Sequence, residues 1–328
     1  MRRRDFLVVA ISAAAGSAAA RAQERVRVRR VGVIMTYAET DPEGQSRLSA
    51  LRDKLRNLGW TEGSNIRIDV RWANGKSDRM HAAAVEFANL PLDVIVANST
   101  SLVGMLKSLT RTIPIVFTQV ADPLTSGLIM NYARPTENIT GFTDFDTSVA
   151  GKWIEILKEV APFVVQVTVL ADPKQSNHPA FVNAIEAAAS SLKIAVRVSG
   201  VRDRIAIEQA IAPLAEQKDQ GLIALPGPIN NSLRDTIIKL AAQYRLPAIY
   251  PFKYYAHDGG LVCYGVDQVD QWSDAAGYVD RIFKGQKPVD LPVQAPTRYQ
   301  LLINLRTAKA LGLDVPAPLL SRADEVIE

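Results

Sequence analysis

The sequence predicts an α/β fold with two doubly wound lobes, each built around a parallel sheet. Residues 93–97 are mostly Val and Ile without alternation, which is typical of a strand buried on both faces. Strand and helix patterns alternate along the chain, which favours a mostly parallel sheet with right-handed crossovers. A strand, a polar loop and a helix occur over residues 93–109 and again over 221–244. This repeat indicates two similar lobes, although a single doubly wound sheet also repeats itself in this way.

The elements can be justified in chain order. Residues 31–35 form an apolar run ahead of a polar loop and are expected to be the first strand. Leucines 48, 51, 55 and 58 share one helical face, and Gly59 is a suitable C-terminal stop. In Ile66–Trp72 apolar and charged residues alternate, which indicates a half-exposed strand. Further helices are expected over residues 78–89, 102–109, 148–160 and 233–244, and further strands over 113–117, 166–170, 221–225 and 261–264.

Three segments without a regular pattern are predicted to carry the chain between the lobes. They are residues 141–147, 265–267 and 290–296, the last with two prolines. Three crossings would make a three-stranded hinge. The first lobe would then comprise residues 26–143 and 267–292, and the second lobe residues 144–266 and 293–328.

Residues 1–22 are predicted to be a signal peptide. Three arginines at positions 2–4 precede an apolar stretch over residues 6–15, and Ala20-Arg21-Ala22 is a cleavage site. Residues 3–7 also resemble a twin-arginine export signal. The apolar stretch is too short to span a membrane. We therefore expect cleavage after Ala22 and a periplasmic protein without stable membrane insertion.

The basic character of the chain belongs largely to this segment. Without Arg2, Arg3, Arg4, Arg21 and Asp5, 34 basic and 33 acidic residues remain, a net charge of +1. This balance gives no reason to expect a nucleic-acid partner. The single cysteine excludes an intramolecular disulfide.

Motifs for enzymatic chemistry are absent from the sequence. It contains no G-x-G-x-x-G after the first strand, no phosphate-binding G-x-x-x-x-G-K-[ST] loop and no G-x-S-x-G elbow. The histidines at 81, 178 and 257 lie far apart, without metal-ligand spacing. We therefore predict no catalytic residue, cofactor or metal.

Polar and aromatic residues at strand ends are the candidate ligand contacts. Asn98, Ser99 and Thr100 either cap the following helix or present hydroxyls and free amides to a carboxylate. Gln119 and Asp122 can accept from an ammonium group, although Asp122 also suits an Asp-Pro turn. A small carboxylate, such as an amino acid or aromatic acid, is the predicted ligand, with its anionic end at Ser99 and Thr100.

Aromatic side chains near these loops can stack on an apolar ligand, although about half of them are expected in the core. The candidates are Tyr37, Phe142, Tyr250, Phe252 and Tyr255.

The chain resembles the ABC-transporter substrate-binding proteins whose better-characterised members bind tryptophan and related aromatic amino acids. The resemblance covers nearly all of the chain after the signal peptide. It rests on Leu58-Gly59-Trp60-Thr61-Glu62-Gly63 with Asn65, Ile113-Pro114-Ile115-Val116-Phe117-Thr118 with Asp122-Pro123, Asn138-Ile139-Thr140-Gly141, Gly285-Gln286-Lys287-Pro288 with Leu291-Pro292-Val293-Gln294, Ile303-Asn304-Leu305 with Thr307-Ala308-Lys309-Ala310-Leu311-Gly312, and the ending Arg322-Ala323-Asp324-Glu325-Val326-Ile327-Glu328.

The resemblance implies a type I periplasmic binding fold, a ligand in the cleft between the lobes, and an ABC permease in the inner membrane as partner. It carries ligand contacts over to residues 98–100 and 119–122, Asn177, Pro228 to Asn230, and Phe252. The loop sequences Ser99-Thr100 and Gly227-Pro228-Ile229-Asn230 depart from the pattern of the aromatic binders, so ligand identity does not transfer. The alternatives are a binding module for a membrane sensor and an exported α/β enzyme.

Overall fold

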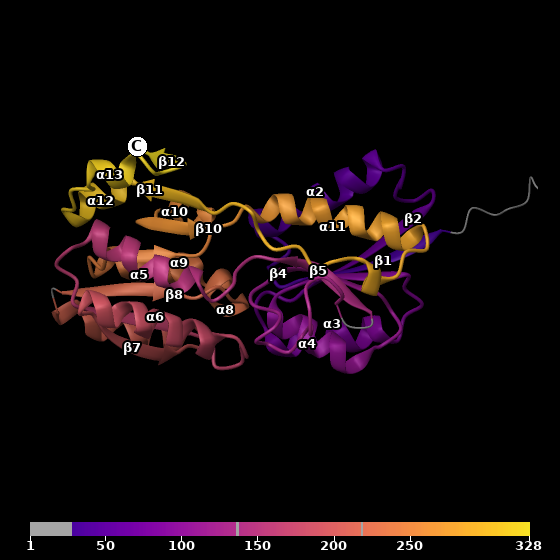
Figure 1. Cartoon of the computed structure of the whole chain (residues 1–328), viewed down its shortest axis with the longest axis horizontal. Helices are drawn as coiled ribbons and strands as arrows, with labels where there is room; N and C mark the ends of the chain where they lie inside the picture. The colour runs from indigo at the N-terminus through magenta and orange to yellow at the C-terminus, as the bar shows by residue number, and fades with distance from the viewer. Residues whose placement is uncertain (1–27, 136–137, 218) are drawn as a thin grey trace, which may run out of the picture.

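The computed structural model describes residues 28–135, 138–217 and 219–328. The predicted signal peptide lies outside these residues. The strands form two separate sheets, which occupy opposite ends of the molecule (Figure 1). We call each sheet with its helices a lobe. None of the helices in the described part of the chain is long and apolar enough to cross a membrane.

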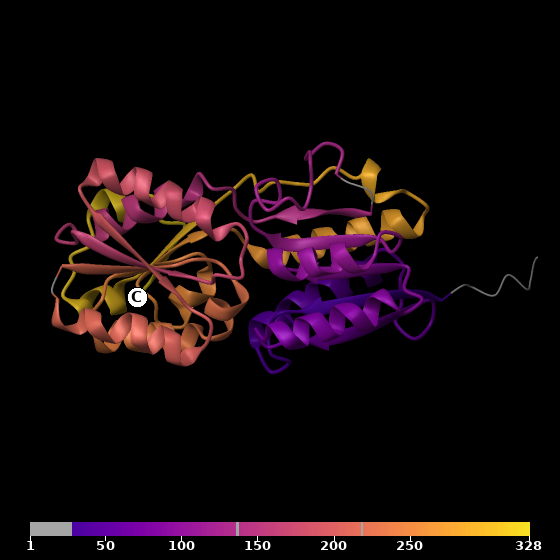
Figure 2. The ribbon, with the colours of Figure 1, turned by 90° about the horizontal axis from the view of Figure 1, so that it is seen from below.

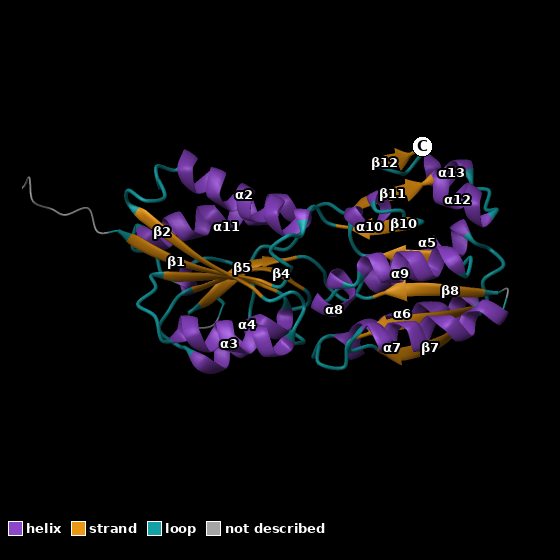
Figure 3. Cartoon of the chain, turned by 180° about the vertical axis from the view of Figure 1, so that it is seen from behind, coloured by secondary structure: helices purple, strands orange, loops and turns teal. Residues whose placement is uncertain are grey.

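The first lobe contains a five-stranded sheet in which every neighbouring pair is parallel. Its strand order is β2 (Ile66–Trp72), β1 (Arg29–Met35), β3 (Val94–Asn98), β4 (Ile115–Val120) and β5 (Ile139–Thr143). Helices α2 (Pro42–Asn57) and α11 (Gln268–Phe283) pack together over one face, and α3 (Ser77–Ala88) and α4 (Thr100–Leu109) cover the other (Figures 1 and 3).

Each face of this sheet has its own apolar core. On one face, Val31 and Val33 of β1 pack with Trp272 of α11. On the other face, Ile95 of β3 packs with Phe87 of α3. Burial on both faces explains why these strands are apolar runs without alternation.

The second lobe contains a seven-stranded sheet with helices on both faces (Figure 2). Its strand order is β12 (Glu325–Ile327), β11 (Gln300–Asn304), β10 (Val262–Gly265), β9 (Ala248–Tyr250), β8 (Gln220–Ala224), β6 (Gln166–Ala171) and β7 (Ala195–Gly200). Its helices are α5 (Val149–Val160), α6 (His178–Leu192), α7 (Arg204–Ile211), α8 (Pro228–Ser232), α9 (Arg234–Gln243), α10 (Lys253–His257), α12 (Leu305–Leu311) and α13 (Ala317–Leu320), with 3₁₀ turns η1 (Ala212–Glu216) here and η2 (Pro288–Asp290) in the first lobe.

One pair in the second sheet is antiparallel, which agrees with the mostly parallel sheet that the sequence patterns predicted. Strand β11 runs opposite to β10, and the other neighbouring pairs are parallel. Strand β10 leads the chain toward the first lobe, and β11 brings it back, so the two neighbours run in opposite directions.

The chain passes between the sheets three times. It crosses after β5, returns between β10 and α11, and crosses again between η2 and β11. At the second crossing, a Cβ on Gly265 would lie 1.7 Å from the carbonyl oxygen of Pro251. Glycine is therefore required for this close backbone approach.

Strand β4 extends further than the sequence pattern indicated. Thr118 and Gln119 were expected in a loop, but both lie within Ile115–Val120. Thr118 is paired with Asn98 of β3, so the ladder continues through the polar residues. At the other end the strand starts after Pro114, which has no N–H to donate.

Candidate functional site

A small central cavity of about 20 Å³ lies between the lobes, where strands of both sheets end. The first lobe contributes residues at the carboxyl ends of β1, β3, β4 and β5, and the second lobe residues that follow β6, β8 and β9. Open α/β sheets bind ligands outside the carboxyl ends of their strands. The lining residues are Thr36, Asn98, Ser99, Thr100, Gln119, Ala121, Asp144, Gln175, Pro226, Gly227, Pro228, Asn231 and Phe252.

Buried amides connect the strands of the first lobe beneath this cavity. The backbone N–H of Thr36 donates to Asn98 Oδ1 (2.9 Å), and Asn98 Nδ2 donates to Thr36 Oγ1 (2.7 Å). Asn98 Nδ2 also donates to Gln119 Oε1 (3.1 Å), which accepts from Trp272 Nε1 as well (3.2 Å). Gln119 Nε2 donates to the hydroxyl of Tyr37 (2.8 Å). Both amides are thus satisfied within the protein, which makes this floor rigid.

Ser99 holds a backbone conformation that L-residues rarely adopt. Its φ and ψ are 79° and 145°, a region used almost only by glycine. Its Oγ accepts from the backbone N–H of Leu102 (3.4 Å) and caps α4. Gln119 also has a positive φ, of 51°. Strain of this kind concentrates at functional sites, and here both residues line the central cavity.

Ser99→Gly is expected to stabilise the ligand-free protein by about 1 kcal/mol, because release of the strain, about 1–3 kcal/mol, exceeds the loss of the cap and the added chain entropy. Thermal or urea unfolding measures the change. Ser101→Gly is the matched control, because Ser101 has an ordinary helical backbone in α4, and glycine there should destabilise through helix propensity and through loss of the hydrogen bond from Gln175 (3.1 Å). Equal destabilisation by both substitutions would contradict the prediction.

Asp144 is the ionisable residue of the cavity lining. It follows β5, its side chain is 2% exposed, and Oδ1 has no hydrogen-bond partner among the described residues. Burial raises the pKa of Asp144 to about 7, because the charged carboxylate loses its hydration. The backbone N–H groups of Asp144 and Phe145 and the side chain of Gln268 lower this pKa, but less than burial raises it.

The two lobes touch around the cavity. Arg234 of α9 forms a two-pronged ion pair with Asp41, which caps α2 (Nη1–Oδ2 2.7 Å, Nη2–Oδ1 3.1 Å). Asn177 Nδ2 donates to the carbonyl of Ala121 (3.0 Å). The buried guanidinium of Arg47 lies between rings of both lobes, 5.1 Å from Tyr37 and 5.4 Å from Tyr254. Lobes joined by such contacts are closed over the central cavity.

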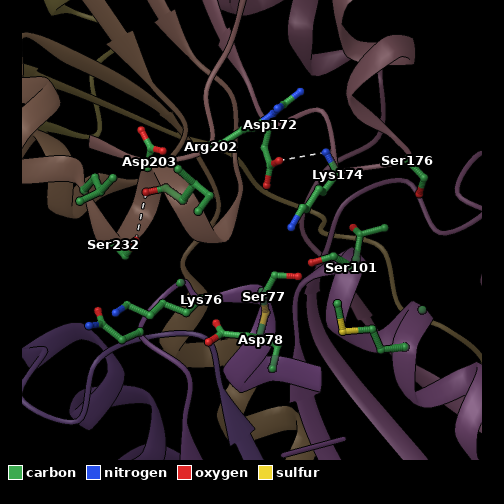
Figure 4. A pocket seen from close by; sticks show the side chains of 18 of the residues that line it. Lys76, Ser77, Asp78, Ser101, Asp172, Lys174, Ser176, Arg202, Asp203 and Ser232 are labelled. Carbon is green, nitrogen blue, oxygen red and sulfur yellow. Dashed lines mark hydrogen bonds between the residues drawn. The ribbon is translucent and has the colours of Figure 1, made fainter. Parts of the chain in front are cut away.

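A larger cavity of about 700 Å³ adjoins the central one, and Thr100 lines both. Lys76, Ser77 and Asp78 of the first lobe face residues of the second lobe across it (Figure 4). Gln175 Nε2 donates to Ser101 Oγ (3.1 Å), and this hydrogen bond joins a residue of the central lining to one of the outer lining. The outer cavity is therefore a vestibule between the lobes.

The family model of the ABC transporter substrate binding protein matches residues 34–327. This chain belongs to that family. This chain is also 25% identical over 283 residues to the tyrosine-binding protein of Clostridioides difficile (strain R20291), and the match covers 86% of this chain and 80% of the relative.

Solved structures share the fold. A conserved domain protein from Vibrio cholerae has a TM-score of 0.84 at 28% identity, covering 92% of this chain and 100% of the other. The ABC domain from Streptococcus pneumonia in complex with L-Trp has a TM-score of 0.83 at 21% identity (91% and 99% covered). The ligand-free, open structure of a substrate binding protein with adhesive properties from Clostridium difficile has a TM-score of 0.64 at 25% identity (92% and 99% covered).

The structure brings six of the predicted contact residues of this substrate-binding protein to the central cavity. They are Asn98, Ser99, Thr100, Gln119, Pro228 and Phe252. All six lie at or after the carboxyl ends of apolar strands, which is the position that the sequence pattern predicted. The hydroxyl of Thr100 donates to the carbonyl of Ala121 (3.3 Å), so a ligand would have to compete for it.

The other five predicted residues lie outside the cavity lining and support the loops. Tyr37 is buried against Arg47, and Phe142 packs against Tyr278 of α11 (4.7 Å between ring centroids). Asp122 Oδ1 accepts from the backbone N–H of Thr125 (3.1 Å) and fixes the turn. Asn177 donates to Ala121, and Asn230 donates to the carbonyls of Leu170 and Leu225 (3.1 and 2.8 Å). Tyr250 and Tyr255, the remaining aromatic candidates, stack on each other in the core (4.7 Å).

Several lining residues of the substrate-binding protein were missed by sequence reasoning. Thr36, Asp144 and Gln175 also follow strands, so their position at strand ends was the available signal. Asn231 lies one residue beyond the predicted loop contact Asn230. No group of His, Cys, Asp or Glu in the described part of the chain could hold a metal ion.

Proposed function

We propose that this substrate-binding protein captures a small organic carboxylate, an amino acid or an aromatic acid, in the cleft between its lobes. The central cavity carries the proposal, because loops from both sheets meet there at the N-terminus of α4. Free amides at a helix N-terminus favour an anionic group. The tyrosine-binding relative and the complex of a structural neighbour with L-Trp support an amino acid with an aromatic side chain.

We further propose that the lobes close around the ligand as rigid bodies. Residues 26–143 with 267–292 would move against residues 144–266 with 293–328, about the three crossings. A cavity of about 20 Å³ is far below the roughly 300 Å³ of small-ligand sites, so a ligand would enter an opened form. The lower TM-score to the open relative than to the L-Trp complex supports a closed arrangement here.

The proposed working place is the periplasm, after cleavage of the signal peptide at Ala22, and the proposed partner is an ABC permease of the inner membrane. Binding, closure and delivery require no catalytic residue, cofactor or metal. Ligand shifts the equilibrium toward the closed form because contacts from both lobes exist only there.

A thermal-shift screen of the mature protein against amino acids, aromatic acids and other small carboxylates tests the ligand class. At one hundred times its dissociation constant, a ligand is expected to stabilise the protein by about 2.7 kcal/mol. Small-angle scattering should then show a smaller radius of gyration for the protein with a saturating concentration of this ligand than for the ligand-free protein. If no member of the panel raises the melting temperature, the proposed ligand class is wrong; sugars and polyols serve as the comparison set.

A further inference from the structure

Asp144 differs from every other residue of the central cavity in carrying a carboxyl group. The thirteen lining residues include no Lys, Arg or His and no other acid. Its side chain is 2% exposed and Oδ1 has no hydrogen-bond partner among the described residues. A buried polar atom without a partner costs free energy and needs a physical reason, and in a cavity lining an incoming ligand can supply the missing partner.

The two buried amides of the first-lobe floor already have hydrogen-bond partners within the protein. Asn98 is bonded to Thr36 and Gln119, and Gln119 is also bonded to Tyr37 and Trp272. Gln268, the side chain beside Asp144, accepts from Arg47 Nη2 (2.6 Å) through its oxygen, and its Nε2 has no hydrogen-bond partner among the described residues. Among the lining residues, Asp144 Oδ1 is the buried acceptor that is left for an incoming hydrogen-bond donor.

A second pole of opposite sign lines the same cavity. Helix α4 has ten residues, no acidic side chain in its first turn, and an N-terminus formed by Ser99 and Thr100. Its free backbone amides carry partial positive charge. The cavity thus offers one carboxylate and one helix N-terminus, without a cationic side chain, and this pairing matches a ligand with one positive and one negative end.

We propose that Asp144 binds the ammonium group of a zwitterionic α-amino acid whose carboxylate lies at the N-terminus of α4. Asp144 then makes the site select amino acids against carboxylic acids that lack the amine. The inference rests on the proposed function and narrows its ligand class. It also replaces Asp122, whose carboxylate holds a turn outside the cavity lining.

The electrostatics of the buried carboxyl agree with this assignment. Burial raises the pKa of Asp144, and no charged side chain is among the groups that shift it. Tyr299 is an ionisable neighbour, and Asp144 contributes to raising the pKa of that tyrosine. A ligand ammonium would supply the missing positive partner and restore the ionised form.

Calorimetry on matched ligands tests the proposal. The panel contains L-tyrosine, its deaminated analogue 3-(4-hydroxyphenyl)propionate, L-tryptophan and its analogue indole-3-propionate. The unchanged protein is expected to bind the amino acids at least tenfold to a hundredfold more tightly than the analogues, because the analogues lack the charged donor. Asp144→Asn is expected to lose this preference by weakening amino-acid binding while leaving the analogues nearly unaffected.

Asp122→Asn is the control and should keep the preference, because asparagine can still accept from Thr125. The assignment is overturned if Asp144→Asn still prefers amino acids to their deaminated analogues. It is also overturned if Asp122→Asn loses this preference while Asp144→Asn keeps it. Equal affinity of the unchanged protein for amino acids and analogues also overturns it, and this comparison needs no variant. If the analogues bind and the amino acids do not, the carboxylate ligand class survives and the ammonium assignment fails; if nothing in the panel binds, both fail.

Discussion

At pH 8, the ligand-free Asp144→Asn variant is expected to unfold at a higher temperature than the unchanged protein. The carboxyl of Asp144 titrates at about 7 in the folded protein, against a usual value of 3.8. The folded protein therefore binds more protons than the unfolded chain between these values, and stability falls as the pH rises through this window. Above pH 7 the ionised carboxylate lowers the free energy of unfolding by its full amount, roughly 4 kcal/mol at 1.36 kcal/mol per pKa unit.

Asparagine keeps the shape of the side chain and removes the charge. Calorimetry measures the melting temperatures of the unchanged protein and of Asp144→Asn at pH 5 and at pH 8. The gain from Asp144→Asn should be large at pH 8 and small at pH 5, where Asp144 is already protonated in the folded state. A gain that does not depend on pH would show that the carboxylate is not a source of instability.

Asp41→Asn is expected to open the lobes and weaken ligand binding. The ion pair between Asp41 and Arg234 joins the lobes, and its side chains are only 9% and 11% exposed. Asparagine can still accept from the N–H of Glu43 and cap α2, so the helix should survive. Loss of a hydrogen bond to a charged group costs about 1.5–3 kcal/mol, which lowers affinity about tenfold to a hundredfold.

Small-angle scattering and calorimetry measure the two effects. The ligand-free variant should have a larger radius of gyration than the unchanged protein, because Arg234 keeps its partners Asp258 and Asn231, and both belong to its own lobe. Glu62→Gln is the control: it breaks an exposed pair with Arg52 inside the first lobe, worth about 1 kcal/mol or less. The same dimensions and affinity in Asp41→Asn and Glu62→Gln would exclude a role of this pair in closure.

The sequence was sufficient for the central strands and for the strand-end part of the site, but not for β5, which covers residues 139–143 although 141–147 were expected to lack regular structure. The run before Asn98 predicted a buried strand, and the position of Asn98 at its end placed the residue in the crevice, because local pattern and topology carry that information. The repeated pattern over residues 93–109 and 221–244 corresponds to β3 and α4 in the first lobe and to β8, α8 and α9 in the second. The family resemblance is confirmed by the match over residues 34–327.

Contacts between segments that lie far apart in the chain could not be predicted from the sequence. Phe142 was a candidate for stacking on a ligand, but α11 returns from the second lobe and places Tyr278 against it. Asp144 and Asp146 follow the same strand, yet only Asp144 is buried. That difference depends on tertiary packing, because Asp144 lines a cavity whose other walls come from segments distant in the sequence. No periodicity within residues 141–147 distinguishes the two acids.

The triple passage of the chain between the sheets affects the order in which the protein can be assembled during synthesis. Trp272 of α11 completes the core around Val31 and Val33, but the ribosome makes it only after most of the second lobe. Strands β11 and β12 come last and close the second sheet against β10. Neither lobe is a contiguous piece of the gene, so an N-terminal fragment ending at residue 266 would leave both lobes incomplete: the first would lack the covering helix α11, and the second would lack strands β11 and β12.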